Sequence, residues 1–324
     1  MTFKDITTSL APEIAQLNAI MASALHSTDT PLMNTIVERY LLSKGKQIRP
    51  IMVMLCSRIF GDIDAAVLHA AAGLELLHNA SLIHDDVVDD TRTRRGRETI
   101  NAVWDNHIAV LVGDFFVSAA LAQAVETGSL QIVKSLSDLG KELSQGEIHQ
   151  ICNARDHSFE TGPYFTAIDK KTASLFKHCA LVGANAHRVP EAIAAPLLRY
   201  AELLGECFQI RDDIFDYFPS TEIGKPTGND LREGKVTLPL LLALKRAPEA
   251  EAEAMKQLLR DRLPDEAEIR ALTEFTHANG GIDAAYAEMA RIHREALPLL
   301  EAYPDSRAKT ALKDLFEFII SRNK

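Results

Sequence analysis

The sequence predicts an all-α protein. Residues 51–162 contain no proline and are rich in Ala, Leu and Glu, a composition typical of long helices. Apolar residues recur at three- and four-residue steps, which gives a helix one apolar face. Alternating strand patterns and Asn-Gly or Asp-Gly hairpin signals between apolar runs are lacking. We therefore expect one large helical domain over residues 1–324.

Each predicted helix is an apolar-periodic stretch bounded by polar, Gly-containing or Pro-containing segments. The first shows the periodicity in Leu10, Ile14, Leu17, Met21 and Leu25. The predicted helices are 9–26, 30–43, 48–60, 64–90, 107–125, 128–155, 162–187, 190–218, 236–246, 249–260, 265–279, 282–300 and 305–322. The least helical stretches, 91–100 and 219–235, are polar, and Gly or Pro interrupts both.

Composition excludes several classes of protein. The chain is 47% hydrophobic and 25% charged, which is ordinary for a soluble globular protein. A net charge of -10 argues against a general nucleic-acid binder. The N-terminus lacks a secretory signal, the cysteines form no CxxC pair, and no stretch approaches the roughly 18 apolar residues of a membrane span. We expect a cytoplasmic protein with at most transient membrane contact.

Two acidic clusters share the spacing DDxxD. They are Asp85-Asp86-Val-Val-Asp89 and Asp212-Asp213-Ile-Phe-Asp216. Carboxylates one helical turn apart repel each other, so one cluster alone would be explained by a solvated helix end. Two copies, each in an apolar helix and each followed by a basic Gly-containing loop, favour a site for Mg²⁺. This cation takes one or two carboxylates together with substrate phosphates.

Cationic and polar side chains accompany both clusters. Arg94 and Arg95 follow the first cluster, and Lys225 and Lys235 follow the second. Lys46 and Arg49 lie earlier in the chain, and His78 precedes Asp85 by almost two whole turns, on the same helical face. Ordinary surface cations would explain any one of these loops. Taken together, they predict a helical enzyme that holds two diphosphate substrates through Mg²⁺ and Arg or Lys.

These residues resemble the all-trans polyprenyl diphosphate synthases, the head-to-tail isoprenyl transferases, from about residue 30 to the C-terminus. The matching motifs are Gly45-Lys46-Gln-Ile-Arg49-Pro50, Glu75-Leu-Leu-His78, the first DDxxD with Arg94-Arg95-Gly96, Val112-Gly113-Asp114, Gly146-Glu147-x-x-Gln150, Lys171-Thr172-Ala173, Phe208-Gln209 through Asp216, and Gly224-Lys225 through Pro239. One departure is Lys44-Gly45-Lys46-Gln47, where the family commonly reads GGKR or GGKK. The resemblance implies an isoprenoid synthase type helical bundle around a deep central cavity, usually as a homodimer.

The resemblance also implies roles for single residues. The Mg²⁺ ligands would be Asp85, Asp89 and Asp212, supported by Asp86, Asp213 and Asp216, with about three ions per active site. The allylic diphosphate would be held by Arg94, Lys171, Thr172, Gln209, Lys225 and Lys235. Isopentenyl diphosphate would be held by Lys46, Arg49, His78 and Arg95. The catalytic set comprises Asp85, Asp86, Asp89, Arg94, Lys171, Gln209, Asp212 and Lys225. The ring of Phe208 and the amide oxygen of Gln209 are candidates for stabilising an allylic cation.

Small residues below the first cluster predict a long product. Ser81 and Ala80 lie about one turn below Asp85, where an aromatic side chain would close the cavity, and Leu77 and Leu74 would form a deeper floor. We expect a product of about C30 to C45, with octaprenyl diphosphate favoured, for quinone side chains. The main alternative is a farnesyl or geranylgeranyl diphosphate synthase.

Two further alternatives are more remote. A class I terpene cyclase normally mixes Asn, Ser or Thr with Glu in its second metal motif, whereas this chain carries a second DDxxD. A non-catalytic subunit of a heteromeric synthase tends to lose aspartates, and both clusters are complete here. The homodimer that the resemblance implies would use helices 9–26 and 107–125.

Overall fold

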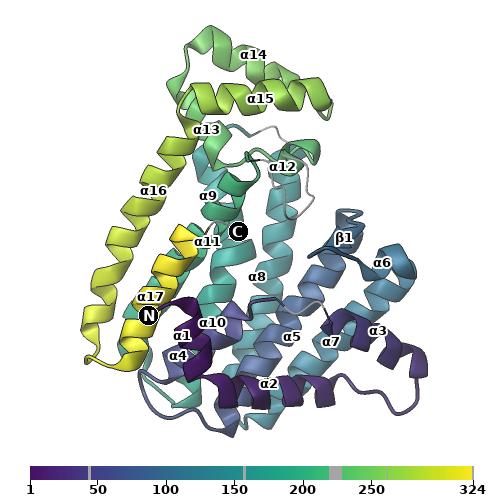
Figure 1. Cartoon of the computed structure of the whole chain (residues 1–324), viewed down its shortest axis with the longest axis vertical. Helices are drawn as coiled ribbons and strands as arrows, with labels where there is room; N and C mark the ends of the chain where they lie inside the picture. The colour runs from purple at the N-terminus through teal and green to yellow at the C-terminus, as the bar shows by residue number, and fades with distance from the viewer. Residues whose placement is uncertain (43–44, 156–157, 219–227, 261, 323–324) are drawn as a thin grey trace. The chain divides into compact units, whose positions relative to one another are not determined.

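The computed structural model describes residues 1–42, 45–155, 158–218, 228–260 and 262–322. Within these ranges nearly every element is a helix, as expected (Figure 1). The elements are α1 (Phe3–Ser9), α2 (Ala11–Ala24), α3 (Pro31–Leu41), α4 (Ile48–Ser57), α5 (Ala65–Val88), β1 (Thr93–Arg94), β2 (Arg97–Glu98), α6 (Ile100–Val103), α7 (Asn106–Glu126), α8 (Leu130–Arg155), α9 (Thr161–Ile168), the π-helical turn η1 (Asp169–Ala173), α10 (Ser174–Ala186), α11 (Glu191–Phe215), α12 (Asn229–Arg232), α13 (Leu238–Arg246), α14 (Glu249–Arg260), α15 (Glu266–Ala278), α16 (Gly281–Ala296), the 3₁₀ helix η2 (Leu297–Ala302) and α17 (Arg307–Ser321).

Two predicted helices are interrupted in the structure. Residues 3–9, most of which lie before the first expected helix at 9–26, form α1, and the side chains of Thr2 and Asp5 make a capping box at its start. Pro12 lies in the first turn of α2, where a missing N–H costs nothing, so a new helix begins there. The helix expected over 162–187 contains the π turn η1, which the 3.6-residue periodicity did not indicate.

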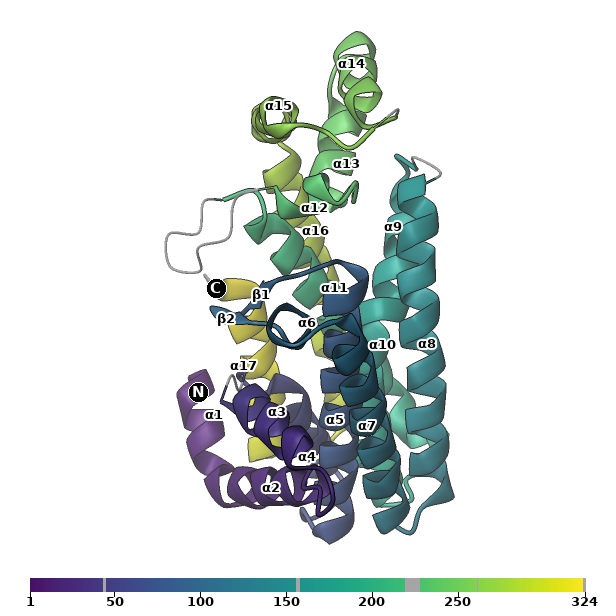
Figure 2. The same ribbon diagram turned by 90° about the vertical axis from the view of Figure 1, so that its right-hand side faces the viewer.

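The polar stretch 91–100, expected to be irregular, contains a small hairpin. Strands β1 and β2 pair antiparallel, with Thr93 opposite Glu98 (Figure 2). The two turn residues, Arg95 and Gly96, both have positive φ, at 52° and 72°. Two successive left-handed residues are what a tight hairpin turn requires, and only the second of them is glycine. The expectation that this stretch lacks strands was therefore wrong.

The chain forms two compact units that are interleaved along the sequence. The first comprises residues 1–141, 175–201 and 299–315, and the second comprises 142–174, 202–298 and 316–324, of which 323–324 are outside the described residues. Helices α8, α11 and α17 each contribute residues to both units. The units are therefore not successive domains, and the single domain expected over 1–324 stays a prediction.

Helix α5 is the central helix of the first unit. Its residues from Ala70 to Ala80 are all buried, and most of them are apolar or small, with Glu75, His78 and Asn79 the polar exceptions. Helices α2, α4 and α7 pack against it (Figure 1). At Gly73 the backbone of α7 approaches so closely that an added Cβ would lie 3.0 Å from the carbonyl oxygen of Ala120. This packing fixes α5, whose C-terminal end carries the first acidic cluster.

In the second unit α13 is the helix around which α9, α15 and α16 pack. Its residues Leu238–Leu241 are buried, and Gly281 of α16 lies against it so closely that an added Cβ would be 2.2 Å from the Pro239 carbonyl oxygen. Helix α15 begins at a capping box formed by Asp265 and Glu268. This group of helices supports the C-terminal end of α11, which carries the second acidic cluster.

Two helices in the described part of the chain are long and apolar enough to cross a membrane by length and composition. They are α5 and α7, with mean hydropathies of 1.2 and 2.0 in their most apolar windows. We expected no such stretch, and that expectation was wrong for these two segments. In α5, 78% of the window is buried, as in the core helix of a globular protein, whereas in α7 the figure is 44%.

Candidate functional site

The first acidic cluster lies at the C-terminal end of α5. The helix ends at Val88, two residues earlier than expected, and Asp89 is its C-cap. The N–H of Asp89 donates to the carbonyl oxygen of Asp85 at 2.8 Å, so these residues remain one turn apart. Asp86 is buried, and its carboxylate accepts from the Nε of Arg94 at 2.9 Å and pairs with the Nη2 at 2.8 Å. The cluster is thus joined to the hairpin that follows it.

Asn101 of α6, which the sequence analysis did not single out, supports this end of α5. Its buried side-chain amide donates to the carbonyl oxygen of Asp86 at 3.0 Å and to that of Thr91 at 3.2 Å. The N–H of Thr91 also donates to the Asp86 carbonyl oxygen, at 2.9 Å. These bonds satisfy a helix-end carbonyl group that has no partner in the helix.

Arg49 and Arg95 lie close to two buried groups of α5, the carboxyl group of Glu75 and the imidazole of His78. Arg49, Arg95 and His78 are three of the four residues expected to hold isopentenyl diphosphate. Burial lowers the pKa of His78 well below its ordinary value, and the nearby charges of Arg49 and Arg95 lower it further. Burial raises the pKa of Glu75, and the same two arginines oppose that rise. His78 is therefore a neutral side chain beside two cations. The fourth residue, Lys46, is exposed before the start of α4.

The second acidic cluster lies on the last turns of α11, where its three carboxylates have different partners. Asp212 forms an ion pair with Arg322, the residue that follows α17. Asp213 is only 3% exposed. Its two oxygens accept from the hydroxyl of Tyr164 at 2.6 Å and from the Nε2 of Gln209 at 2.7 Å. These contacts belong to the second unit.

Asp216 holds the segment that follows the cluster. Its two oxygens accept from the backbone N–H groups of Asn229 and Asp230 at 2.9 and 3.0 Å. The hydrogen bonds fix the start of α12, and the N–H of Lys235 bonds back to the Asp230 carbonyl oxygen at 2.8 Å. Lys225, expected to hold the allylic diphosphate, lies outside the described residues.

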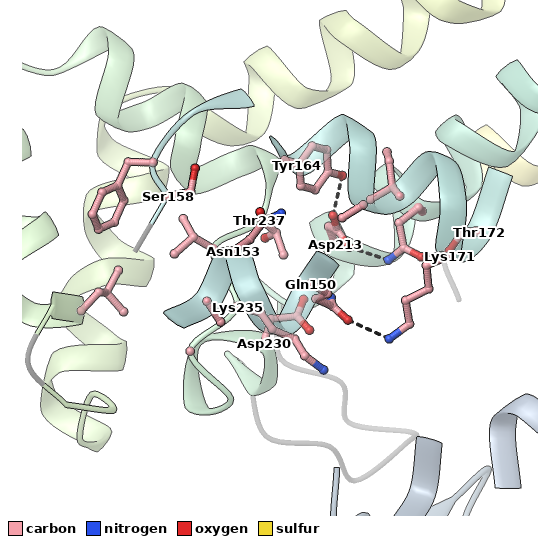
Figure 3. Close-up of a pocket in the computed structure, with 18 residues that line it drawn as sticks. Gln150, Asn153, Ser158, Tyr164, Lys171, Thr172, Asp213, Asp230, Lys235 and Thr237 are labelled. Atoms are coloured by element: carbon pink, nitrogen blue, oxygen red, sulfur yellow. Dashed lines mark hydrogen bonds between the residues drawn. The ribbon is translucent and has the colours of Figure 1, made fainter. Parts of the chain in front are cut away.

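A pocket of about 170 Å³ brings together most of the residues expected at the allylic diphosphate (Figure 3). Lys171, Thr172, Gln209 and Lys235 all line it, together with Asp213. The π turn η1 supplies Lys171 and Thr172, and α11 supplies Gln209. Its other lining residues include Gln150, Asn153, Ser158, Phe159, Tyr164, Ala167, Ile168, Asp230, Thr237 and Leu259. Arg94, the remaining allylic candidate, belongs to the first unit.

Lys171 is held in this pocket by α8. Its Nζ donates to the Oε1 of Gln150 at 2.7 Å (Figure 3). The same Nζ forms an ion pair with Glu147. Gly146 explains the close approach, since an added Cβ would lie 2.5 Å from the backbone nitrogen of Lys171. Gly146, Glu147 and Gln150 belong to one of the matching motifs, to which we assigned no role from the sequence. The structure shows that they fix the position of Lys171.

Magnesium fits the chemistry of these carboxylates. Burial raises the pKa of Asp213 to about 7, and the charges of Asp212 and Asp216 contribute to the rise. Burial and the charges of Asp216 and Asp213 raise the pKa of Asp230 well above its ordinary range. A divalent cation would relieve this repulsion. Among the described residues no group of three or more His, Cys, Asp or Glu side chains is placed to hold a metal ion, and the expected Mg²⁺ stays a prediction.

The four residues expected to set product length lie on α5. Leu74, Leu77 and Ala80 are buried. Ser81 is half-buried, and its hydroxyl donates to the carbonyl oxygen of His78 at 2.9 Å. Their small or aliphatic character is as expected, and their effect on chain length stays a prediction.

Two site residues, Tyr164 and Arg322, had no signal that we recognised in the sequence. Tyr164 precedes Lys171 by seven positions, almost two helical turns, but the π turn between them alters the register on which such spacing depends. Arg322 lies beyond the last helix. It covers the ring of Phe208, with 4.2 Å between the guanidinium carbon and the ring centroid. One face of the ring expected to stabilise an allylic cation is therefore covered by Arg322 in this structure.

Comparison with known proteins places these features in a family. The Polyprenyl synthetase family model matches residues 30–276. The chain is 35% identical to heptaprenyl diphosphate synthase component 2 of Geobacillus stearothermophilus over the full length of both proteins. It is 33% identical to octaprenyl diphosphate synthase of Haemophilus influenzae, covering 100% of this chain and 98% of the relative.

Solved structures agree with the sequence relatives. A polyprenyl synthase from Caulobacter crescentus CB15, complexed with calcium and isoprenyl diphosphate, matches with a TM-score of 0.92 and 32% identity over 100% of this chain and 98% of that one. A geranylgeranyl pyrophosphate synthase from Bacteroides thetaiotaomicron matches with a TM-score of 0.85 and 38% identity over 98% of both chains. The fold is thus that of the isoprenoid synthases, as expected, and defines a helical prenyltransferase. The chain belongs to the polyprenyl synthetase family.

Proposed function

We propose that the protein condenses an allylic diphosphate with successive isopentenyl diphosphate units to give a long-chain polyprenyl diphosphate. The observation that carries the proposal is the pocket in which Lys171, Thr172, Gln209 and Lys235 meet beside buried carboxylates. Two cations can bind a diphosphate there, and the polar oxygens of Thr172 and Gln209 lie within the same pocket. The full-length match to a heptaprenyl and an octaprenyl diphosphate synthase supports the same reaction.

The residues suit a reaction that begins by ionisation. The allylic C–O bond breaks, and both electrons leave with the diphosphate, whose growing negative charge Lys171 and Lys235 stabilise. The double bond of isopentenyl diphosphate then attacks the allylic carbon, and a proton passes to the released diphosphate. Bound Mg²⁺, held by Asp85, Asp89 and Asp212, would add charge stabilisation of the leaving group. No side-chain nucleophile is needed.

Product length is proposed at about C30 to C45, with octaprenyl diphosphate favoured for a quinone side chain. The small side chains of Ala80 and Ser81 and the names of the relatives described above support a long product. A geranylgeranyl diphosphate synthase is the second candidate, because the Bacteroides structure shares 38% identity with this chain. A long apolar product also supports transient membrane contact by a cytoplasmic enzyme.

We further propose a homodimer that uses α7. Val110, Leu111, Leu121 and Val125 of this helix are between 41% and 63% exposed. Exposed apolar residues grouped on one helix mark an interaction surface. Helix α2, also expected at the interface, buries Leu17 and Met21 and packs on α5 and α7 of its own unit. A native mass of about twice 35.7 kDa is expected.

Release of inorganic pyrophosphate, measured with each substrate alone and with both, tests the reaction class. Condensation requires both substrates and Mg²⁺, so farnesyl diphosphate alone should release none. Release from farnesyl diphosphate alone would indicate a cyclase. An inactive but folded chain of monomeric mass would favour a heteromeric synthase, since one relative is named as a component 2.

A further inference from the structure

We propose that Tyr164 is a positioning residue which, through Asp213, orients the amide of Gln209 so that its carbonyl oxygen faces the reacting allylic group. The inference rests on the proposed prenyl transfer and deepens it. Tyr164 lines the pocket with Lys171 and Thr172 (Figure 3). The hydroxyl of Tyr164 donates a hydrogen bond to the carboxylate of Asp213, so we assign it no direct role in binding a diphosphate.

Three hydrogen bonds connect Tyr164, Asp213, Gln209 and Thr172 in series, and the first two of them join Tyr164 to Gln209. The hydroxyl of Tyr164 donates to Oδ2 of Asp213 at 2.6 Å, and Nε2 of Gln209 donates to Oδ1 at 2.7 Å. The hydroxyl of Thr172 then donates to Oε1 of Gln209 at 2.7 Å. The four side chains come from α9, α11 and η1, so the series joins three elements around the pocket.

The direction of each hydrogen bond follows from the chemistry of the groups. Nε2 of Gln209 donates to Asp213, so the NH₂ faces that carboxyl group and the amide oxygen points the other way, toward Thr172. The hydroxyl of Tyr164 donates to the other oxygen of Asp213. The oxygen of Gln209 accepts one hydrogen bond from Thr172 and retains a second lone pair.

Tyr164 is needed because Asp213 is almost fully buried, with 3% of its surface exposed. A buried carboxyl oxygen that loses its donor is costly, so without the hydroxyl the side chain of Asp213 turns away from its present position. This change releases the NH₂ of Gln209. An amide that flips would present its NH₂ hydrogens, which carry partial positive charge, where the allylic carbon becomes cationic. Such a flip removes stabilisation at the ionisation step.

The kinetic test is Tyr164→Phe, which keeps the ring and removes only the hydroxyl. We expect kcat to fall about tenfold while KM for isopentenyl diphosphate stays within about twofold. In a Gln209→Leu background the same substitution should cost less than about twofold, because the group it orients is gone. A similar loss in both backgrounds, or a loss confined to KM, overturns the inference.

A matched control separates orientation from stability. Tyr200 is fully buried, and its hydroxyl donates to the carbonyl oxygen of Leu312 at 2.6 Å, in the first unit. Tyr200→Phe removes an equally buried hydrogen bond that lies outside the allylic pocket. It should lower the free energy of unfolding and leave kcat unchanged. A fall in kcat equal to that of Tyr164→Phe would show that any lost buried hydroxyl has this effect, and would overturn the inference.

Binding of two unreactive allylic diphosphate analogues tests the inference without turnover. One carries an ammonium nitrogen at the position that becomes cationic, and the other is its neutral counterpart. By calorimetry, Tyr164→Phe should weaken the cationic analogue about tenfold and change the neutral one less than about twofold. Equal affinities in variant and wild type overturn the inference. If the wild type binds both analogues but does not condense the substrates, the proposed prenyl transfer is wrong and the role of Tyr164 is not contradicted. If the wild type binds neither analogue, both the proposed prenyl transfer and the role of Tyr164 are wrong.

Discussion

The guanidinium of Arg322 forms an ion pair with the carboxylate of Asp212, 110 positions earlier in the chain. The Arg322 side chain is 9% exposed, and its carbonyl oxygen accepts from the Nε and Nη2 of Arg211 at 3.0 and 2.5 Å. A cation fixed to the chain thus lies at a carboxylate expected to bind Mg²⁺. It must move or share that carboxylate when the metal binds.

Replacing Arg322 by Gln should therefore tighten divalent-cation binding. The competing charge is removed, and because Asp212 is partly exposed we expect a gain of about three- to fivefold in affinity. Titration with Mn²⁺ as a spectroscopic substitute for Mg²⁺ measures the effect. Arg291→Gln is the control, because Arg291 pairs with Glu288 and Glu295 on the exposed face of α16. Unchanged or weaker binding in Arg322→Gln would contradict the prediction.

Stability should depend on pH through His78. Burial, aided by Arg49, Arg95 and Arg94, lowers its pKa well below 6.5. The unfolded chain takes up a proton at this residue as the pH falls through about 6.5, whereas the folded chain does not. The stabilisation present above that pH is therefore lost as the pH falls, by at most about 1.4 kcal/mol per pH unit.

The His78→Gln variant isolates this contribution. Urea unfolding at pH 7.5, 6.5 and 5.5 should show that the wild type loses more stability than the variant below about pH 6.5. Other titrating groups cancel in the difference between the two proteins. A difference that stays constant over this range would mean that the His78 pKa is not lowered.

A methyl group introduced at Gly146 of α8 should displace Lys171. In Gly146→Ala the new Cβ would lie 2.5 Å from the Lys171 backbone nitrogen and 2.8 Å from its Cα, so the backbone must shift. We expect a loss of about 1–3 kcal/mol in stability and a rise in KM for the allylic diphosphate. Gly140→Ala, on the same helix with open space around its Cα, should be neutral or stabilising by about 0.5–1 kcal/mol. Equal behaviour of the two variants would rule out the close contact.

Product length should respond to Ser81. A phenylalanine at this position, one turn below Asp85, is expected to close the space for the growing chain and shorten the product to about C15 or C20. Ser81→Ala, which stays small, should leave the length unchanged. Chromatography of dephosphorylated products gives the answer, and an unaltered length in Ser81→Phe removes Ser81 from the floor of the cavity.

Sequence periodicity predicted most helices because the pattern that defines them is local. The centre of α5 follows from a run of mostly apolar and small residues, and four of the residues that the family motifs assigned to the allylic diphosphate line one pocket. The π turn η1 was missed because it changes the helical period within one turn. The Arg95-Gly96 turn was missed because a non-glycine residue adopts positive φ there.

The hydrogen-bond partners of the site residues could not be predicted in the same way. Tyr164 and Asp213 are 49 positions apart, and Arg322 and Asp212 are 110 apart. Such pairs depend on how α9, α11 and the segment after α17 pack, which no local pattern records. The motif Gly146-Glu147-x-x-Gln150 was visible in the sequence, but its contact with Lys171 became apparent only in three dimensions.

Elongation to a long-chain product can be tested by measuring the sizes of the products. The pure protein is incubated with Mg²⁺, farnesyl diphosphate and labelled isopentenyl diphosphate, and the dephosphorylated products are separated by length. We expect a ladder that ends between about C30 and C45. A ladder that stops at C15 or C20 would contradict the long-chain proposal, and no extension from any allylic primer by the folded protein would contradict prenyl transfer itself.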